Sequence, residues 1–127
     1  MYDFNYRKAS SLDDASKAMG SASEGKYMSG GMSLIPTLKL RLAKPSDVID
    51  LATIPGLAGI SVDKSTISVG AMTRHFAVNT SAEVKRAIPA LAKLTGLIGD
   101  PAVRYRGTLG GSIANNDPAA DYPAAVL

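Results

Sequence analysis

Two glycine-rich segments, one near each end of the chain, limit the possible folds more than any other feature. Gly30 and Gly31 stand between residues 26–29, which are typical of a strand, and residues 33–40, which are apolar at helical spacing. The second segment, residues 107–112, contains three more glycines. Because glycine has no side chain, an anion can approach the backbone closely, and the start of a helix adds a partial positive charge. Each segment is therefore either a tight turn or part of an anion-binding site.

The residues around these glycines favour a diphosphate ligand. Ser33 adds a hydroxyl donor to the first segment, and Thr108 and Ser112 add two to the second. Two such segments in one small domain indicate that both phosphates are held from opposite sides, although simple turns remain the alternative. Neither segment has the Gly-Lys-Ser/Thr ending of a P-loop or the Gly-x-Gly-x-x-Gly spacing of a dinucleotide motif.

The remaining sequence predicts short strands and helices, an α+β fold with α/β-like character. The hydroxyl of Ser11 is expected to cap a helix by accepting a hydrogen bond from the NH of Asp14, and Thr73 is expected to cap a later helix. Residues 107–118 are expected to form a turn, and residues 103–106 carry no clear signal. Strands are expected at residues 4–6, 26–29 and 48–49 and in a hairpin of residues 60–62 and 66–69, and helices at residues 12–20, 33–40, 81–87, 89–97 and 119–127.

Composition excludes several other classes of function. The chain has no cysteine and a single histidine, His75, so a thiolate metal site or a catalytic triad is not expected, and His75 is interpreted as structural. Its net charge is only +3, it has no tryptophan, and aromatic residues make up 6%, which argues against nucleic-acid binding. No apolar run approaches the roughly 18 residues of a transmembrane helix.

The last residues of the sequence are apolar and carry no helix-ending signal. Residues 124–127 include no glycine and no basic residue. Natural helices commonly end with a glycine in a left-handed conformation. We therefore expect the chain to be the N-terminal portion of a truncated domain.

Several motifs resemble the FAD-binding medium subunit of the molybdenum hydroxylase family, which includes aerobic carbon monoxide dehydrogenase and xanthine dehydrogenase. Residues 29–36, Ser-Gly-Gly-Met-Ser-Leu-Ile-Pro, followed by Lys-Leu-Arg at 39–41, resemble the first FAD segment of that family. Thr-Leu-Gly-Gly-Ser at 108–112 resembles the second. The likeness continues in order at residues 54–57, 69–73, 98–101 and 116–123, so it covers essentially the whole chain.

This resemblance implies a FAD-binding domain of the vanillyl-alcohol-oxidase or xanthine-dehydrogenase type. Residues 1–55 are expected to form a first subdomain with the first FAD segment, and residues 56–127 the start of a second. The resemblance implies no catalytic residue and no metal ligand in this chain. The implied cofactor-binding residues are Ser29, Gly30, Gly31, Met32, Ser33, Leu34, Thr108, Gly110, Gly111, Ser112, Asn115, Asp117 and Asp121.

The resemblance also assigns a role to each group of residues. The backbone of the first segment and the hydroxyl of Ser33 hold the pyrophosphate, the second segment follows the phosphates and the ribityl chain, and Asp121 contacts the flavin nucleotide. Two positions depart from the family pattern. Met32 often corresponds to histidine or another polar residue, and Ser112 to Asp or Asn, so the contacts made by those side chains differ here.

The implied function is that of an electron-transfer subunit, an oxidoreductase component that is inactive as an isolated fragment. In this family, FAD receives electrons from a 2Fe-2S small subunit, which takes them from a large subunit with a molybdopterin cofactor, and passes them to an external acceptor. The expected location is the cytoplasm, and association with the inner face of the membrane is the alternative location. The alternative function is a non-catalytic fragment or nucleotide-binding module that holds no flavin alone.

Overall fold

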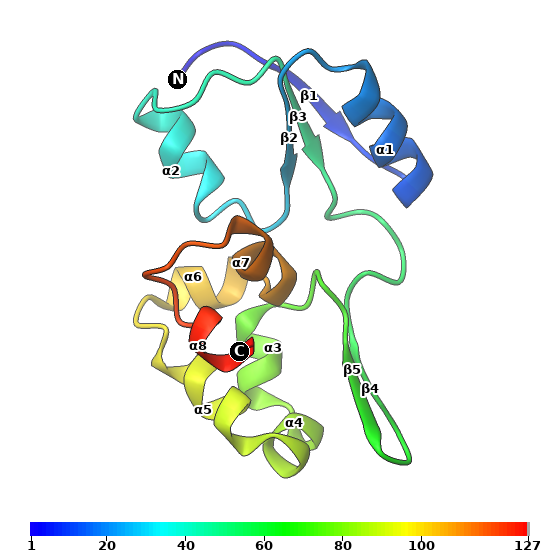
Figure 1. The fold of residues 1–127 in the computed structure, drawn as a ribbon, viewed down its shortest axis with the longest axis vertical. Coiled ribbons are helices and arrows are strands. Elements are labelled where there is room, and N and C mark those ends of the chain that lie inside the picture. The colour runs from blue at the N-terminus through cyan, green and yellow to red at the C-terminus, as the bar shows by residue number, and fades with distance from the viewer. Residues whose placement is uncertain (127) are drawn as a thin grey trace. The chain divides into compact units, whose positions relative to one another are not determined.

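The computed structural model describes residues 1–126 and contains two compact units (Figure 1). The first unit is Met1–Pro55, and the second begins at Gly56. Within residues 1–126, no helix is long and apolar enough to cross a membrane.

The first unit is built on a parallel three-stranded sheet in the order β1-β3-β2. The strands are β1 (Asn5–Lys8), β2 (Gly25–Met28) and β3 (Asp47–Asp50). Every residue of the central strand β3 is buried, as expected for a parallel strand covered on both faces. The connections run through α1 (Leu12–Ser21) and α2 (Leu34–Lys39), which lie on opposite sides of the three strands (Figure 1).

The start of α1 confirms the cap expected from the sequence. Ser11 has extended backbone angles, and its hydroxyl accepts a hydrogen bond of 3.0 Å from the NH of Asp14. The carboxylate of Asp14 in turn accepts a bond of 2.8 Å from the NH of Ser10. The first bond satisfies an NH group that the first helical turn leaves free, and the second holds the residue before the cap against the helix, so the chain turns sharply from β1 into α1.

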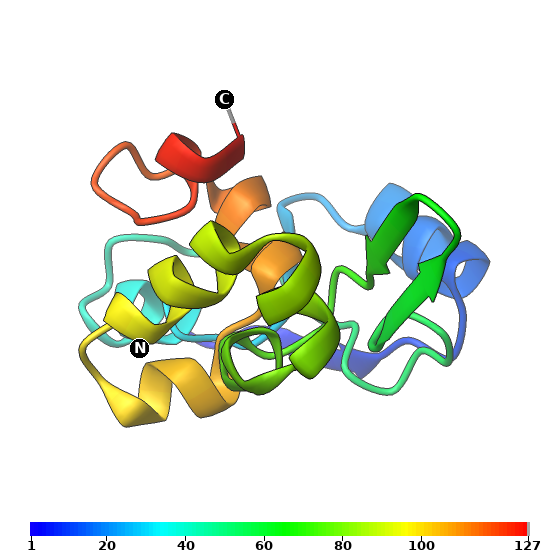
Figure 2. The same ribbon diagram turned by 90° about the horizontal axis from the view of Figure 1, so that it is seen from below.

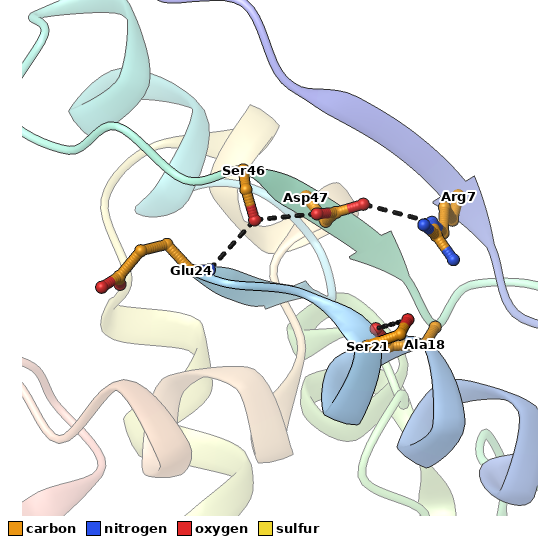
Figure 3. Close-up of polar contacts among 6 residues, drawn as sticks. All are labelled: Arg7, Ala18, Ser21, Glu24, Ser46 and Asp47. Atoms are coloured by element: carbon orange, nitrogen blue, oxygen red, sulfur yellow. Dashed lines mark hydrogen bonds and ion pairs between the residues drawn. The ribbon is translucent and has the colours of Figure 1, made fainter.

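A buried carboxylate ties the three strands together at the start of β3 (Figure 3). Asp47 Oδ2 accepts a hydrogen bond of 2.8 Å from the hydroxyl of Ser46, which accepts one of 3.0 Å from the NH of Glu24 next to β2. Asp47 Oδ1 lies 3.2 Å from Nε of Arg7 on β1, which is an ion-pair distance without hydrogen-bond geometry. The charge of Asp47 on β3 is thus balanced by Arg7 on the neighbouring strand β1, which favours the pairing of these two strands.

The second unit combines a hairpin with a group of short helices (Figure 2). The predicted hairpin is confirmed: β4 (Ile60–Asp63) pairs antiparallel with β5 (Thr66–Val69). The described helices are α3 (His75–Thr80), α4 (Ala82–Ala87), α5 (Pro89–Leu97), α6 (Pro101–Arg106), α7 (Leu109–Asn115) and α8 (Pro123–Val126). Their core is a buried cluster of Val78, Val84 and Ala92, on which apolar residues of both hairpin strands pack.

Three predictions of local structure in the second unit are wrong in whole or in part. Residues 109–115 form the helix α7, not part of a turn. Residues 101–106 form α6, in a stretch where residues 103–106 carry no clear signal in the sequence. Thr73 does not cap α3, because its hydroxyl donates a hydrogen bond of 3.0 Å to the carbonyl of Gly59 and accepts another of 3.0 Å from the Gly59 NH. The helix expected over residues 119–127 begins only at Pro123, and residue 127 lies outside the described part.

Candidate cofactor-binding site

The first glycine segment, residues 29–34, connects the end of β2 to the start of α2. Gly31 is buried and has a φ of +75°, a left-handed conformation that favours glycine. A Cβ atom at Gly31 would lie 2.8 Å from Cδ1 of Ile35. Glycine is therefore required here by the backbone conformation and by the packing of the first turn of α2, independently of any ligand.

Most of the backbone NH groups of this segment, those of residues 31–34, are not used within the described residues 1–126. The first hydrogen bond of α2 runs from the NH of Ile35 to the carbonyl of Gly31, at 2.9 Å. Within residues 1–126, the NH groups of residues 31–34 donate no hydrogen bond. Ser33 is the N-cap residue of α2, but its exposed hydroxyl makes no capping bond. Consecutive free donors at a helix start form a concave site that suits an anion.

The second glycine segment, residues 107–112, uses its NH groups internally. The hydroxyl of Thr108 is the N-cap of α7 and accepts a hydrogen bond of 3.1 Å from the NH of Gly111. The NH of Leu109 donates to the carbonyl of Thr73 at 3.0 Å, and the NH of Gly110 donates to the carbonyl of Ala71 at 2.8 Å. The backbone NH donors of this segment that were expected to hold phosphate are thus already partnered within the second unit.

Gly110 is needed where α7 crosses the preceding chain. A Cβ atom there would lie 2.6 Å from Cβ and 2.8 Å from the carbonyl oxygen of Ala71. Residues 71–73 therefore act as a platform on which the start of α7 rests. Residues 69–73 are part of the family resemblance, but the sequence indicates no role for them in the site. The platform's only sequence signal was Gly70-Ala71, two small residues that permit close contact.

The remaining predicted ligands of the second unit present side chains to solvent. Asn115, Asp117 and Asp121 are exposed, and Ser112 is half-buried at the start of α7. Asp117 Oδ1 accepts a hydrogen bond of 2.9 Å from the NH of Ala119, so it stabilises a turn. Within residues 1–126, the side chains of Ser112, Asn115 and Asp121 have no hydrogen-bond partner. A hydroxyl, an amide and a carboxylate are suited to sugar hydroxyls.

The two groups of predicted ligands lie in different compact units. Residues 29–34 belong to the first unit, and the ligands from Thr108 to Asp121 belong to the second. An open hollow of about 440 Å³ in the first unit is lined by side chains of α1, β1 and β3 and includes none of the predicted ligands. Among residues 1–126, no cluster of histidine and carboxylate side chains is suited to holding a metal ion.

The family of the chain follows from its match to known proteins. A family model described as the FAD binding domain in molybdopterin dehydrogenase matches residues 2–127. The chain belongs to this family of FAD-binding domains. The family that the motifs along the whole chain resemble is therefore confirmed, and so is FAD as its cofactor.

Subunits of two bacterial dehydrogenases are similar to this FAD-binding domain in sequence. The carbon monoxide dehydrogenase medium chain of Hydrogenophaga pseudoflava is 43% identical over 122 residues, which cover 95% of this chain and 42% of that protein. The 6-hydroxypseudooxynicotine dehydrogenase complex subunit alpha of Paenarthrobacter nicotinovorans is 38% identical over 125 residues, covering 98% of this chain and 42% of that protein. The chain thus spans less than half the length of these relatives.

Solved structures confirm the fold class. Carbon monoxide dehydrogenase from Hydrogenophaga pseudoflava superposes with a TM-score of 0.93 at 43% identity, over 96% of this chain and 43% of that chain. Quinoline 2-oxidoreductase from Pseudomonas putida 86 gives a TM-score of 0.86 at 38% identity, over 91% of this chain and 40% of that chain. The residues present fit FAD, because free NH donors suit its diphosphate and free polar side chains suit its hydroxyls.

Proposed function

We propose that this FAD-binding domain holds FAD through two chemically different sets of groups, one in each unit. The observation that carries the proposal is the contrast between the glycine segments. The NH groups of residues 31–34 are free, whereas those of Leu109, Gly110 and Gly111 are bonded within the second unit. Free NH donors recognise phosphate oxygens, while engaged donors leave recognition to side chains.

In this proposal the first glycine segment binds the diphosphate. The NH groups of residues 31–34 and the hydroxyl of Ser33 donate hydrogen bonds to phosphate oxygens, and the positive end of the α2 dipole adds attraction. The half-buried Met32 contributes packing and no charge. Hydrogen bonds to a charged partner are stronger than neutral ones, so this segment provides most of the affinity.

The second unit then recognises the sugar and ribityl hydroxyls. Ser112 offers a hydroxyl, Asn115 an amide and Asp121 a carboxylate, each without a hydrogen-bond partner within residues 1–126. Thr108, Gly110 and Gly111 hold α7 in place for these contacts. Asp117 shapes the turn that leads to Asp121.

The parent protein is proposed to be an oxidoreductase subunit. When bound, FAD supplies the redox chemistry, and the chain's own residues bind and orient it. One relative is named a medium chain and another a subunit of a dehydrogenase complex. These names support the proposal that the parent protein is part of a multi-subunit oxidoreductase. We propose a molybdenum-cofactor large subunit and a 2Fe-2S small subunit as its partners, with electrons entering from the iron-sulfur clusters and leaving to an external acceptor.

A fluorescence titration of the 127-residue chain with FAD tests the proposal, with FMN and ADP as comparison ligands. We expect FAD to bind more tightly than FMN, which lacks the diphosphate, and ADP to compete with FAD. Equal affinity for FMN and FAD would contradict diphosphate recognition. Failure of FAD to bind both this chain and the chain extended by the remainder of the subunit would overturn the proposed function.

A further inference from the structure

Tyr122 is buried in a part of the chain that is otherwise exposed. Residues 115–119 and Asp121 are exposed, yet Tyr122 is only 1% exposed and is among the largest fully buried side chains. Its hydroxyl lies 3.0 Å from Nδ1 of His75, which is 47 positions earlier in the chain. The two rings also contact each other, with centroids 5.2 Å apart and planes inclined by 32°.

His75 is itself held firmly at the start of α3. Its NH donates a hydrogen bond of 3.1 Å to the carbonyl of Gly107, and a Cβ atom at Gly107 would lie 2.7 Å from Nε2 of the ring. The ring therefore fits between the junction of α6 with α7 and the side chain of Tyr122. Burial lowers the pKa of His75, although the nearby charge of Asp121 raises it in part, and a neutral ring fits this enclosed place.

We propose that His75 and Tyr122 form a positioning pair that holds the turn of residues 116–121 where Asp121 can contact FAD. The inference rests on the proposed function, in which Asp121 is a ligand of the cofactor. Asp121 and Tyr122 are adjacent but differ in burial, so the buried phenol fixes the backbone while the carboxylate remains at the surface. A turn that is ordered before binding loses less conformational entropy when the ligand arrives.

Within residues 1–126, backbone hydrogen bonds attach this turn to a helix at its first residue, where the NH of Asn116 bonds the carbonyls of Ser112 and Ile113 at the end of α7. The turn's own hydrogen bonds run from Ala119 to the Asp117 carboxylate and from Ala120 to the Asp117 carbonyl, both within the turn. These two bonds shape the turn but do not attach its far end, next to Tyr122, to the helices. The His75–Tyr122 bond joins the end of the turn to α3, and the bonds from Ala125 and Val126 to the Tyr122 carbonyl continue from there into α8.

Hydrogen exchange of the full 127-residue chain tests whether the pair holds the turn. Tyr122→Phe removes only the hydroxyl, and Tyr105→Phe is the matched control because Tyr105 is exposed on α6. We expect Tyr122→Phe to speed amide exchange in residues 117–121 by about tenfold, with smaller changes in α4 and α5. Unchanged exchange in the turn would overturn the inference.

FAD affinity separates a positioning role from a merely structural one. We expect Tyr122→Phe to weaken FAD binding about tenfold, Tyr105→Phe to leave it unchanged, and Tyr122→Phe to add no further loss when Asp121 is already alanine. Binding of inorganic pyrophosphate, which has no sugar, should not change. Wild-type FAD affinity in Tyr122→Phe would overturn this inference alone, whereas no FAD binding by the unaltered protein would overturn the proposed function and this inference with it.

Discussion

Thr108 and Ser33 are both hydroxyl residues at the N-cap position of a helix, but their hydroxyl groups differ in the bonds they make. Thr108 caps α7 by accepting a hydrogen bond from the NH of Gly111, and it is buried. Ser33 occupies the same position before α2 but makes no capping bond and is exposed. A helix start without its cap leaves NH groups free, which is unfavourable for the protein alone but favourable for binding an anion.

Ser33→Ala tests this difference at the level of one atom. We expect FAD affinity to fall about tenfold or more, because a hydrogen bond to a charged phosphate contributes about 1.5–3 kcal/mol. The free energy of unfolding should hardly change, since no bond within the described protein is lost. Fluorescence titration and urea unfolding measure the two quantities. Ser65→Ala, in the exposed turn of the hairpin, is the control and should bind FAD as the wild type does.

The stability of the second unit is expected to depend on pH through His75. Burial lowers its pKa from 6.5, so the unfolded chain binds a proton more readily than the folded one. Stability is then fully present above about pH 6.5 and falls below it, by at most about 1.4 kcal/mol for each pH unit. Urea unfolding at pH 7.5 and 5.5 measures this loss.

His75→Asn provides the control for this pH effect, because asparagine does not titrate. The pKa values of Asp14 and Glu83 are lowered from 3.8 and 4.5, mainly by hydrogen bonds from Ser10 and Ser81 respectively, so their titration affects stability only at lower pH. The variant should be less stable than the wild type at pH 7.5 but should lose less stability between pH 7.5 and 5.5. An equal loss in both proteins would contradict the assignment to His75.

At the scale of elements, the contact of α7 with the platform of residues 71–73 decides the shape of the second segment. Glycine costs about 1 kcal/mol relative to alanine in a helix interior, so Gly110 and Gly111 disfavour α7 locally. The bonds from the NH groups of Leu109 and Gly110 to carbonyls of the platform offset this cost. The close approach to Ala71 is possible only because Gly110 lacks a side chain.

Gly110→Ala and Gly20→Ala should therefore have opposite effects on stability. At Gly110 the new methyl group would meet Ala71 at 2.6 Å, and overpacking of this kind costs about 1–3 kcal/mol. Gly20 lies in α1 with nothing within 4 Å of a Cβ atom, so the same change should stabilise by up to about 1 kcal/mol. Urea unfolding measures both. A neutral effect at Gly110 would show that the platform contact is not tight.

At the scale of the whole molecule, the proposed ligand groups belong to two units, so one cofactor should stabilise both. FAD at a hundred times its dissociation constant is expected to add about 2.7 kcal/mol to the free energy of unfolding. Hydrogen exchange should slow in the first glycine segment and in residues 112–121 together. FMN at the same concentration should have a smaller effect, and protection confined to one unit would contradict a ligand shared by both.

The sequence by itself determined the features that depend on neighbouring residues. The hydroxyl of Ser11 caps α1 because Asp14 follows three residues later, and the alternation of residues 60–69 produces the hairpin because it matches the strand period. The family could be recognised because its motifs are contiguous. These signals lie within a few residues of one another, so they need no knowledge of the fold.

Only the tertiary structure decided which polar groups are available for a ligand. The sequence of residues 107–112 predicts an open glycine turn. In the structure, the carbonyls of Thr73 and Ala71, far earlier in the chain, accept hydrogen bonds that stabilise the start of the helix α7. Thr73 was expected to cap a helix and instead bonds Gly59, and Tyr122 is buried through contact with His75. Each outcome depends on a partner more than ten positions away, and local propensity contains no information about such partners.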